Sequence, residues 1–404
     1  MTMAQLLLHN ARVILESGVR RGGVLIRDRR IALVFAHEQT PAGLSASETI
    51  DLGGAYLAPG MIDIHIHGST GVDVQSTDAA GLTKLSAFLL AEGVTAYFPT
   101  FVPSDEQGYR DSIAAIGSYI DQQDNAHRNN KAQVVARILG IHFEGPFVSE
   151  HRCGALRREH LRTYDGDARS LEQFISGPSL SPRLMTLAPE IQGGLDLTRE
   201  LTRNGVRVFI GHSQADPAIL DLAFEAGARH ITHFPNALDP LHHRRPGAVA
   251  WGLLRDDVTL DCIADFHHVH PLMLRLIYQS KSADRMALIS DAIMPAGLGD
   301  GEFSVWGEGI TVRDGRTALA RQPGESTIAG SVITMRQAVR NIVDLGVPVH
   351  EAVRMASLVP ARIAGIESEL GSIKEGTRAE LIAFDDEFAV RLTTIGGAPV
   401  SYNS

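Results

Sequence analysis

Residues 59–68 read PGMIDIHIHG, and this stretch sets the interpretation of the whole chain. From Ile62 to His67, apolar residues alternate with polar ones, which is typical of a β-strand whose successive side chains point to opposite faces. Residues 76–93, STDAAGLTKLSAFLLAEG, then show the apolar spacing of an amphipathic helix. The chain therefore enters its central part with a strand followed by a helix.

The same order of strand and helix recurs through the middle of the chain. Seven further apolar runs are VTAYFPTFV (94–102), RILGIHFEG (137–145), RLMTLAPE (183–190), VRVFIGHS (206–213), HITHFPN (230–236), TLDCIADF (259–266) and MALISDA (286–292). Helical stretches such as PAILDLAFEAGA (217–228) lie between them. This alternation predicts an α/β fold, a (β/α)₈ TIM-like barrel. A doubly wound open sheet is the alternative, but the glycine-rich dinucleotide loop expected after its first strand is missing.

Both ends of the chain have a sequence pattern that differs from the strand–helix alternation of the middle. Residues 6–14, 22–35 and 48–60 alternate short apolar runs with turns, and residues 371–400 repeat the pattern, which indicates short antiparallel strands. Glycine and charged residues interrupt these runs too often for helices. We expect residues 1–55 and 368–404 to form one small β-sandwich module beside a catalytic barrel of residues 56–367.

Composition limits the classes of partner. The 404 residues are 44% hydrophobic and 21% charged, an ordinary balance for a globular protein, and the net charge is -10. An acidic chain is a poor match for nucleic acid, and no apolar run is long enough to span a membrane. Two cysteines are too few for a disulfide framework, and the N-terminal residues lack signal-peptide features. These features predict a cytoplasmic protein with reduced thiols.

Polar side chains that stand at or just after the ends of the apolar runs are the candidate site. They are His65, His67, Glu144, His212, His233 and Asp291. The carboxyl ends of barrel strands form one face, so these side chains are expected to converge. Imidazoles with a carboxylate suit Zn²⁺ or Fe²⁺, and the cysteine count excludes a thiolate site. Asp291 can take a proton from water and pass it to a leaving amine.

Each of these residues also has a plain structural interpretation when it is taken alone. His65 and His67 can be satisfied polar groups at a strand end, and Glu144 can be an acid at a helix N-terminus. Asp291 can be the N-cap of the next helix. The full set at successive strand ends is what favours a metal site.

At these residues the chain resembles the N-acetylglucosamine-6-phosphate deacetylases of the amidohydrolase superfamily. The matching segments keep their order over nearly the whole length: PGMIDIHIHG, GIHFEGPFVS, TLAPE, GHSQAD, THFPNAL, HHRRPG, IADFHHVHP, ISDA, IAGSVITM and MASLVPAR. The Glu-Gly-Pro-Phe segment that starts at Glu144 is the most specific of them, because other amidohydrolases use a carboxylated lysine as the bridging ligand.

The resemblance implies removal of the acetyl group from N-acetylglucosamine 6-phosphate, with Asp291 as the catalytic aspartate. It assigns the principal metal to Glu144, His212 and His233. His65 and His67 imply a second metal that shares Glu144, so two ions per subunit are favoured over one. The implied substrate contacts are Ala155, Asn236, Ala237, Arg244, His268, Thr327, Ile328 and Ala329. A homodimer is also implied, in which Arg244 reaches the neighbouring active site.

Four positions depart from the family pattern. Leu156 stands where the family has a histidine near the acetyl group, and Phe266 stands where it has glycine and takes space from the sugar loop. Arg245 replaces an acidic residue and Pro235 an aromatic residue or leucine. These changes favour, as an alternative, a related amidohydrolase for another N-acetylhexosamine phosphate, a non-phosphorylated N-acyl sugar or another amide. A sugar-phosphate-binding protein without activity is a third hypothesis, which the intact Asp291 opposes.

Overall fold

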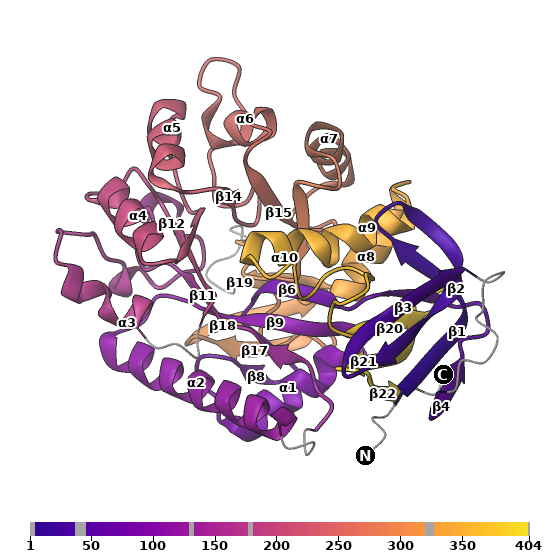
Figure 1. Ribbon diagram of the computed structural model, residues 1–404. Helices are drawn as coiled ribbons and strands as arrows, with labels where there is room; N and C mark the ends of the chain where they lie inside the picture. Colours follow the sequence, from indigo (N-terminus) through magenta and orange to yellow (C-terminus); the bar gives the residue numbers. More distant parts are fainter. Residues whose placement is uncertain (1–4, 37–45, 129–132, 177–180, 320–326, 403–404) are drawn as a thin grey trace.

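The central part of the chain forms a parallel barrel in the computed structural model, which describes residues 5–36, 46–128, 133–176, 181–319 and 327–402 (Figure 1). The barrel strands, in spatial order, are β6 (Met61–Ile66), β9 (Val94–Phe101), β11 (Ile141–Glu144), β12 (Arg183–Leu187), β13 (Arg207–Ile210), β14 (His230–Ile231), β15 (Thr259–Ile263) and β16 (Met286–Ile289). A short strand, β10 (Arg137–Ile138), adds to β9. The predicted fold class is confirmed.

The barrel closes between its first and last strands. Ile66 forms a parallel bridge with Ala292, and the backbone N–H of His67 donates to the Ala292 carbonyl at 2.8 Å. The Asp291 N–H donates to the His65 carbonyl at 2.9 Å. Two candidate histidines and the candidate aspartate therefore meet at this seam.

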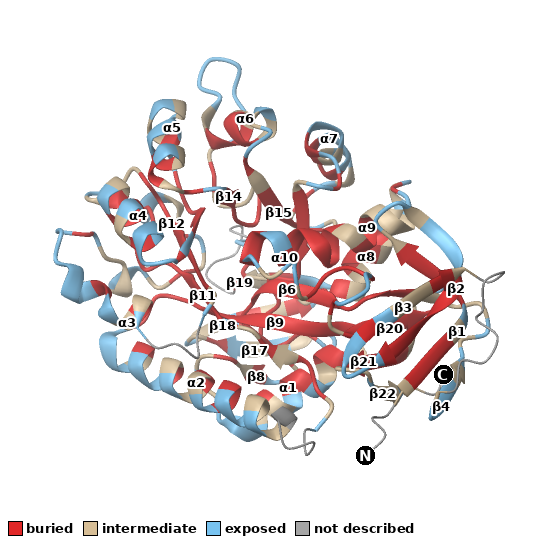
Figure 2. Cartoon of the chain, viewed as in Figure 1, coloured by how far each residue is buried: buried red, intermediate tan, exposed pale blue. Residues whose placement is uncertain are grey.

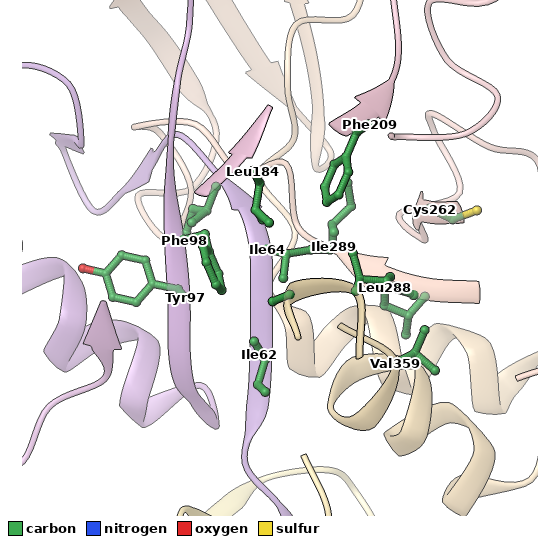
Figure 3. Packing of buried hydrophobic residues seen from close by; sticks show 14 of the residues in the cluster. Ile62, Ile64, Tyr97, Phe98, Leu184, Phe209, Cys262, Leu288, Ile289 and Val359 are labelled. Atoms are coloured by element: carbon green, nitrogen blue, oxygen red, sulfur yellow. The ribbon is translucent and has the colours of Figure 1, made fainter. Parts of the chain in front are cut away.

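Apolar side chains fill the barrel and its contacts with the helices. Every residue of β6, β9, β11 and β16 is buried, as expected for parallel strands covered on both faces (Figure 2). Ile62 and Ile64 of β6 belong to the same core cluster as Phe98, Leu184 and Leu288 (Figure 3). A packed interior holds the strand ends, and hence the polar residues on them, in fixed positions.

Helices follow the barrel strands and surround them. They are α1 (Ala79–Ala91), α2 (Glu106–Arg128), α3 (Glu172–Ile175), α4 (Gly194–Arg203), α5 (Pro217–Ala226), α6 (Gly247–Leu254), α7 (Pro271–Lys281), α8 (Met335–Asp344), α9 (Val349–Ala356) and α10 (Leu358–Ala364). Their ends follow local rules: the Asp216 side chain caps α5, and Gly227 ends it with a φ of 117°. Among the described residues, no helix has both the length and the apolar character needed to cross a membrane.

The two ends of the chain build one mixed sheet, on the right in Figure 1. Its strands are β1 (Gln5–Leu15), β2 (Gly18–Arg27), β3 (Arg30–Ala36), β4 (Glu48–Asp51), β5 (Tyr56–Pro59), β20 (Leu381–Phe384), β21 (Val390–Ile395) and β22 (Ala398–Ser401). The expectation that all of them are antiparallel is wrong, because β4 and β5 both pair parallel to β1. Alternation predicts a strand but not its direction. Along the chain, β2 and β3 come between β1 and these two strands, whereas in the sheet β4 and β5 pair directly with β1. Residues 1–4, 37–45 and 403–404 of the expected terminal module lie outside the described residues.

A small antiparallel sheet is inserted after β16. It consists of β17 (Gly301–Val305), β18 (Glu308–Arg313) and β19 (Arg316–Leu319). A separate pair, β7 (Gly68–Ser69) and β8 (Val72–Asp73), follows β6. The sequence interpretation did not include the β17–β19 sheet, which supplies one side chain to the cavity described below.

Candidate metal centre and active site

The six polar residues predicted from the sequence come together at one end of the barrel. His65 lies in β6 and His67 directly after it, Glu144 ends β11, and His212, His233 and Asp291 each stand two residues beyond β13, β14 and β16. All six are buried, as Figure 2 shows for the strands that carry them. The carboxyl ends of the strands thus bring residues from 65 to 291 into one cluster.

Three of these residues have unusual backbone angles. His212, His233 and Asp291 have φ values of 49°, 33° and 49°, in the left-handed region that L-residues seldom adopt. Each turn comes where the chain leaves a strand. Strain of this kind persists where the surrounding structure fixes it, and it collects at functional sites.

Glu144 stands between two pairs of histidines. Its Oε1 atom lies 2.9 Å from His212 Nε2 and 3.0 Å from His233 Nε2, whereas Oε2 lies 3.3 Å from His67 Nε2. His65 Nε2 is 3.7 Å from Oε1. Two ligand groups result, His65–His67–Glu144 and Glu144–His212–His233, and within each the ligand atoms lie within 4.8 Å of one another. One carboxylate is therefore shared by two candidate cation sites.

The hydrogen bonds of the imidazoles show that this arrangement fits a cation. His67 Nδ1 lies 3.0 Å from the Thr100 carbonyl and His212 Nδ1 lies 2.7 Å from the Arg152 carbonyl. Carbonyls only accept, so each Nδ1 carries a proton, and in the neutral imidazole each Nε2 presents a lone pair to the carboxylate. Lone pairs facing one another in a buried site need a proton or a metal ion between them.

The pKa shifts of His67 and Glu144 also indicate that the cluster fits a cation. Burial alone lowers the pKa of His67, but the carboxylates of Asp291 and Glu144 outweigh it and raise the value to about 10. Burial raises the pKa of Glu144, yet His65, His212 and His233 together bring it well below its usual range. The cluster therefore favours ionised carboxylates and a positive charge between them.

Asp291 is close to the pair from β6. Its Oδ1 atom lies 3.1 Å from His67 Nε2 and 3.4 Å from His65 Nε2, and 11% of its side chain is exposed. Burial raises the pKa of Asp291, but His65 and His67 lower it below its ordinary value. A carboxylate that is ionised and reaches the cavity is suited to accept a proton.

A cavity of about 400 Å³ opens over this cluster. It is lined by His67, Glu144, His212, His233 and Asp291, and by Ala155, Asn236, Ala237, His268, Thr327, Ile328 and Ala329 among the predicted substrate contacts. Arg244 is the predicted contact that the structure does not bring there, because it lies in the exposed loop before α6.

Leu156 and Phe266, the two residues that depart from the family pattern on the substrate side, differ in where they lie relative to the cavity. Leu156 lines the cavity and packs with Val102, Val148 and Cys153. Phe266 does not line it, so the interpretation that Phe266 takes space from the pocket is wrong. Its backbone has a φ of 65°, which favours glycine, and its ring packs against the barrel core instead.

Sequence reasoning missed Trp306, Asp261 and the carbonyl partners of the imidazoles. Trp306 lines the cavity from the turn between β17 and β18. Asp261 is fully buried, lies 2.7 Å from His230 Nε2 and accepts the backbone N–H of His233, so it fixes the turn that carries His233. A Trp-Gly pair between two alternating runs was the available signal for Trp306; backbone carbonyls leave no sequence signal.

The model of the amidohydrolase family matches residues 56–400. The chain is 36% identical over 347 residues to an N-acetylgalactosamine-6-phosphate deacetylase of Escherichia coli O157:H7, covering 86% of this chain and 88% of that protein. It is 32% identical over 394 residues to the N-acetylglucosamine-6-phosphate deacetylase of Bacillus subtilis (strain 168), covering 97% and 96%.

Solved structures of similar proteins share the fold. The N-acetylglucosamine-6-phosphate deacetylase from Pasteurella multocida superimposes with a TM-score of 0.88 at 29% identity, over 98% of this chain and 100% of that one. A variant of the enzyme from Mycobacterium smegmatis, solved with N-acetyl-D-glucosamine-6-phosphate, gives a TM-score of 0.85 at 29% identity over 99% and 100%.

Proposed function

The chain belongs to the amidohydrolase family, and we propose that it removes the acetyl group from N-acetylglucosamine 6-phosphate, giving glucosamine 6-phosphate and acetate. The observation that carries the proposal is Glu144, shared by two histidine pairs beside Asp291 in a cavity. Relatives that span almost the whole chain carry this activity in their names.

Glu144, His212 and His233 would hold the principal divalent cation, and His65 and His67 would hold a second with Glu144 in common. Zn²⁺ or Fe²⁺ suits this set of nitrogen and oxygen ligands, and we favour two ions per subunit. When bound, the cations would supply Lewis acidity for the amide carbonyl and for the attacking water near neutral pH.

Asp291 would move the proton. Its carboxylate is ionised and faces the cavity, so it accepts the proton of the attacking water. It then delivers that proton to the amide nitrogen as the C–N bond breaks, and the amine departs neutral. Its Oδ1 atom lies 3.1 Å from His67 Nε2 and 3.4 Å from His65 Nε2, so Asp291 stands beside the second candidate cation site.

The sugar phosphate would be bound by the remaining walls. Asn236, Ala237 and His268 line the cavity at the ends of β14 and β15, and His268 Nδ1 is 2.6 Å from Asp265 Oδ2, which fixes its ring. Thr327, Ile328, Ala329 and Ala155 complete the pocket for the sugar.

Arg244 would complete the phosphate site of a neighbouring subunit in a homodimer. The loop that carries it is exposed, and Leu241 and Leu254, within ten residues of it in sequence, are 51% and 82% exposed. Leu272, which is 68% exposed, lies in α7, the helix that contacts α6. Apolar residues exposed to this degree are suited to a protein interface.

We further infer a division into a supporting module (residues 1–55 and 368–404) and a catalytic barrel (56–367). The two cysteines are free and buried, which suits a reducing cytoplasm.

Incubation of the metal-loaded protein with N-acetylglucosamine 6-phosphate, followed by assay of acetate and free amine, tests the proposal. Stoichiometric release of both is expected, and absence of turnover with any N-acetylhexosamine 6-phosphate would refute it. N-acetylgalactosamine 6-phosphate is a second candidate substrate, favoured by the 36% identity to the galactosamine enzyme. The ratio of kcat/KM for the two sugars decides between them.

A further inference from the structure

Trp306 stands between two cavities. Besides the active-site cavity of about 400 Å³, a second one of about 450 Å³ lies beside it and is lined by Asp73, Gln75, Ser104 and Arg157 among others. Within the part of the chain that the structure describes, Trp306 is the one residue that lines both. Trp306 therefore lies at the boundary between them.

The backbone at Trp306 is held in an unfavourable conformation. Val305 pairs with Glu308, so Trp306 and Gly307 form a two-residue hairpin turn with φ values of 53° and 83°. Such turns favour asparagine or aspartate followed by glycine, and a bulky residue at positive φ is an outlier. A tryptophan at this turn position indicates that its side chain has a function there.

The indole is also fixed in place. Its Nε1–H donates to Asp73 Oδ2 at 2.8 Å, and Asp73 Oδ1 accepts the backbone N–H of Gln75 at 2.9 Å. The ring meets the His67 imidazole edge-on, with centroids 5.1 Å apart. Trp306 therefore lies against a candidate metal ligand, at the end of the cavity where the amide must react.

Beside Trp306 the cavity has an apolar wall, to which Leu156 contributes. Trp306 packs with the cluster that contains Leu156, Val102 and Val148, whereas the proposed sugar contacts, such as His268, come from other strands. A methyl group next to the reacting carbonyl is best buried against such a surface. In this orientation the acyl group of the substrate would face Trp306.

We propose that Trp306 determines acyl specificity: its indole, positioned by Asp73, closes the acyl end of the active site and limits the substrate to an N-acetyl group. This inference rests on the proposed function. Removal of the ring would join the two cavities, so that longer N-acyl groups fit beside His67. The reaction is unchanged: water adds across the amide C–N bond and gives the carboxylic acid and the amine.

Trp306→Asn is the decisive variant, because asparagine suits the left-handed turn and removes the ring. The readout is kcat/KM for N-butanoyl- and N-acetylglucosamine 6-phosphate. The wild type should prefer acetyl, and the butanoyl-to-acetyl ratio should rise at least about ten-fold in the variant, a selectivity change of about 1.4 kcal/mol. Trp306→Phe, with a smaller ring, should raise the ratio less and provides the readout if the asparagine variant does not fold.

Asp73→Ala should raise the same ratio, because the indole loses its anchor. Phe303→Ala is the control. Phe303 belongs to the same β17–β19 sheet but lines neither cavity, so the butanoyl-to-acetyl ratio of this variant should stay as in the wild type. An unchanged ratio in the Trp306 variants, with acetyl turnover intact in the wild type, overturns the inference alone. Failure of the wild type to release acetate overturns the proposed function, and this inference with it.

Discussion

Substitution of Asp291 by asparagine removes a proton acceptor and little else. The two side chains have the same shape, so asparagine can occupy the same place beside His67 and His65, whose Nε2 atoms lie 3.1 and 3.4 Å from Asp291 Oδ1. General acid–base groups typically contribute about 10²–10⁴-fold to the rate, which is about 3–5 kcal/mol of transition-state stabilisation. Since only 11% of the Asp291 side chain is exposed, solvent offers little replacement, and we expect the upper half of that range in kcat.

Steady-state kinetics of Asp291→Asn with N-acetylglucosamine 6-phosphate, together with its metal content, is the assay. We expect a kcat lower by about 10³–10⁴-fold, a KM within about three-fold of the wild type and unchanged metal content. A kcat within ten-fold of the wild type would refute the role of Asp291 as the proton carrier. Loss of metal together with activity would instead assign Asp291 to the ligand set.

Three further perturbations have defined outcomes. Arg244→Ala should raise KM for the 6-phosphate substrate by about 10–100-fold, which corresponds to the free energy of one hydrogen bond to a charged group. An equal rise in KM for an unphosphorylated N-acetyl sugar would contradict the role of Arg244 in phosphate binding. Chelation of the metals should lower the free energy of unfolding by at least about 3 kcal/mol, measured by urea titration and restored by Zn²⁺; an unchanged midpoint would speak against a bound ion. Gly365→Ala should cost about 1–2 kcal/mol of stability with kcat unchanged, because Gly365 has a φ of 73° and an added Cβ would meet Arg207 Nη2 at 1.8 Å; unaltered stability would show that this turn relaxes.

The sequence was sufficient for the barrel and for the cluster at its mouth. Parallel strands buried on both faces appear as mostly apolar runs, and polar residues at their ends, such as Glu144 after RILGIHF, are visible at once. Because every barrel strand points the same way, strand ends far apart in sequence must meet. Topology alone therefore predicts that His65 and Asp291 are neighbours.

Features that depend on how loops fold could not be predicted in this way. Left-handed turns at His212, His233 and Asp291 have no local sequence signal, since none of these residues is glycine. The parallel pairing of β4 and β5 with β1 depends on which way the chain returns to the sheet. Trp306 reaches the cavity from an inserted sheet whose position over the barrel is set by tertiary packing.

Metal content measured by elemental analysis, on the wild type and two variants, tests the central claim that Glu144 is shared by two cation sites. We expect two ions per chain in the wild type, close to none in Glu144→Gln, and one in His67→Asn, which belongs to only one of the two groups. A Glu144→Gln variant that keeps both ions, or a wild type that binds a single ion unaffected by His67→Asn, would contradict the account.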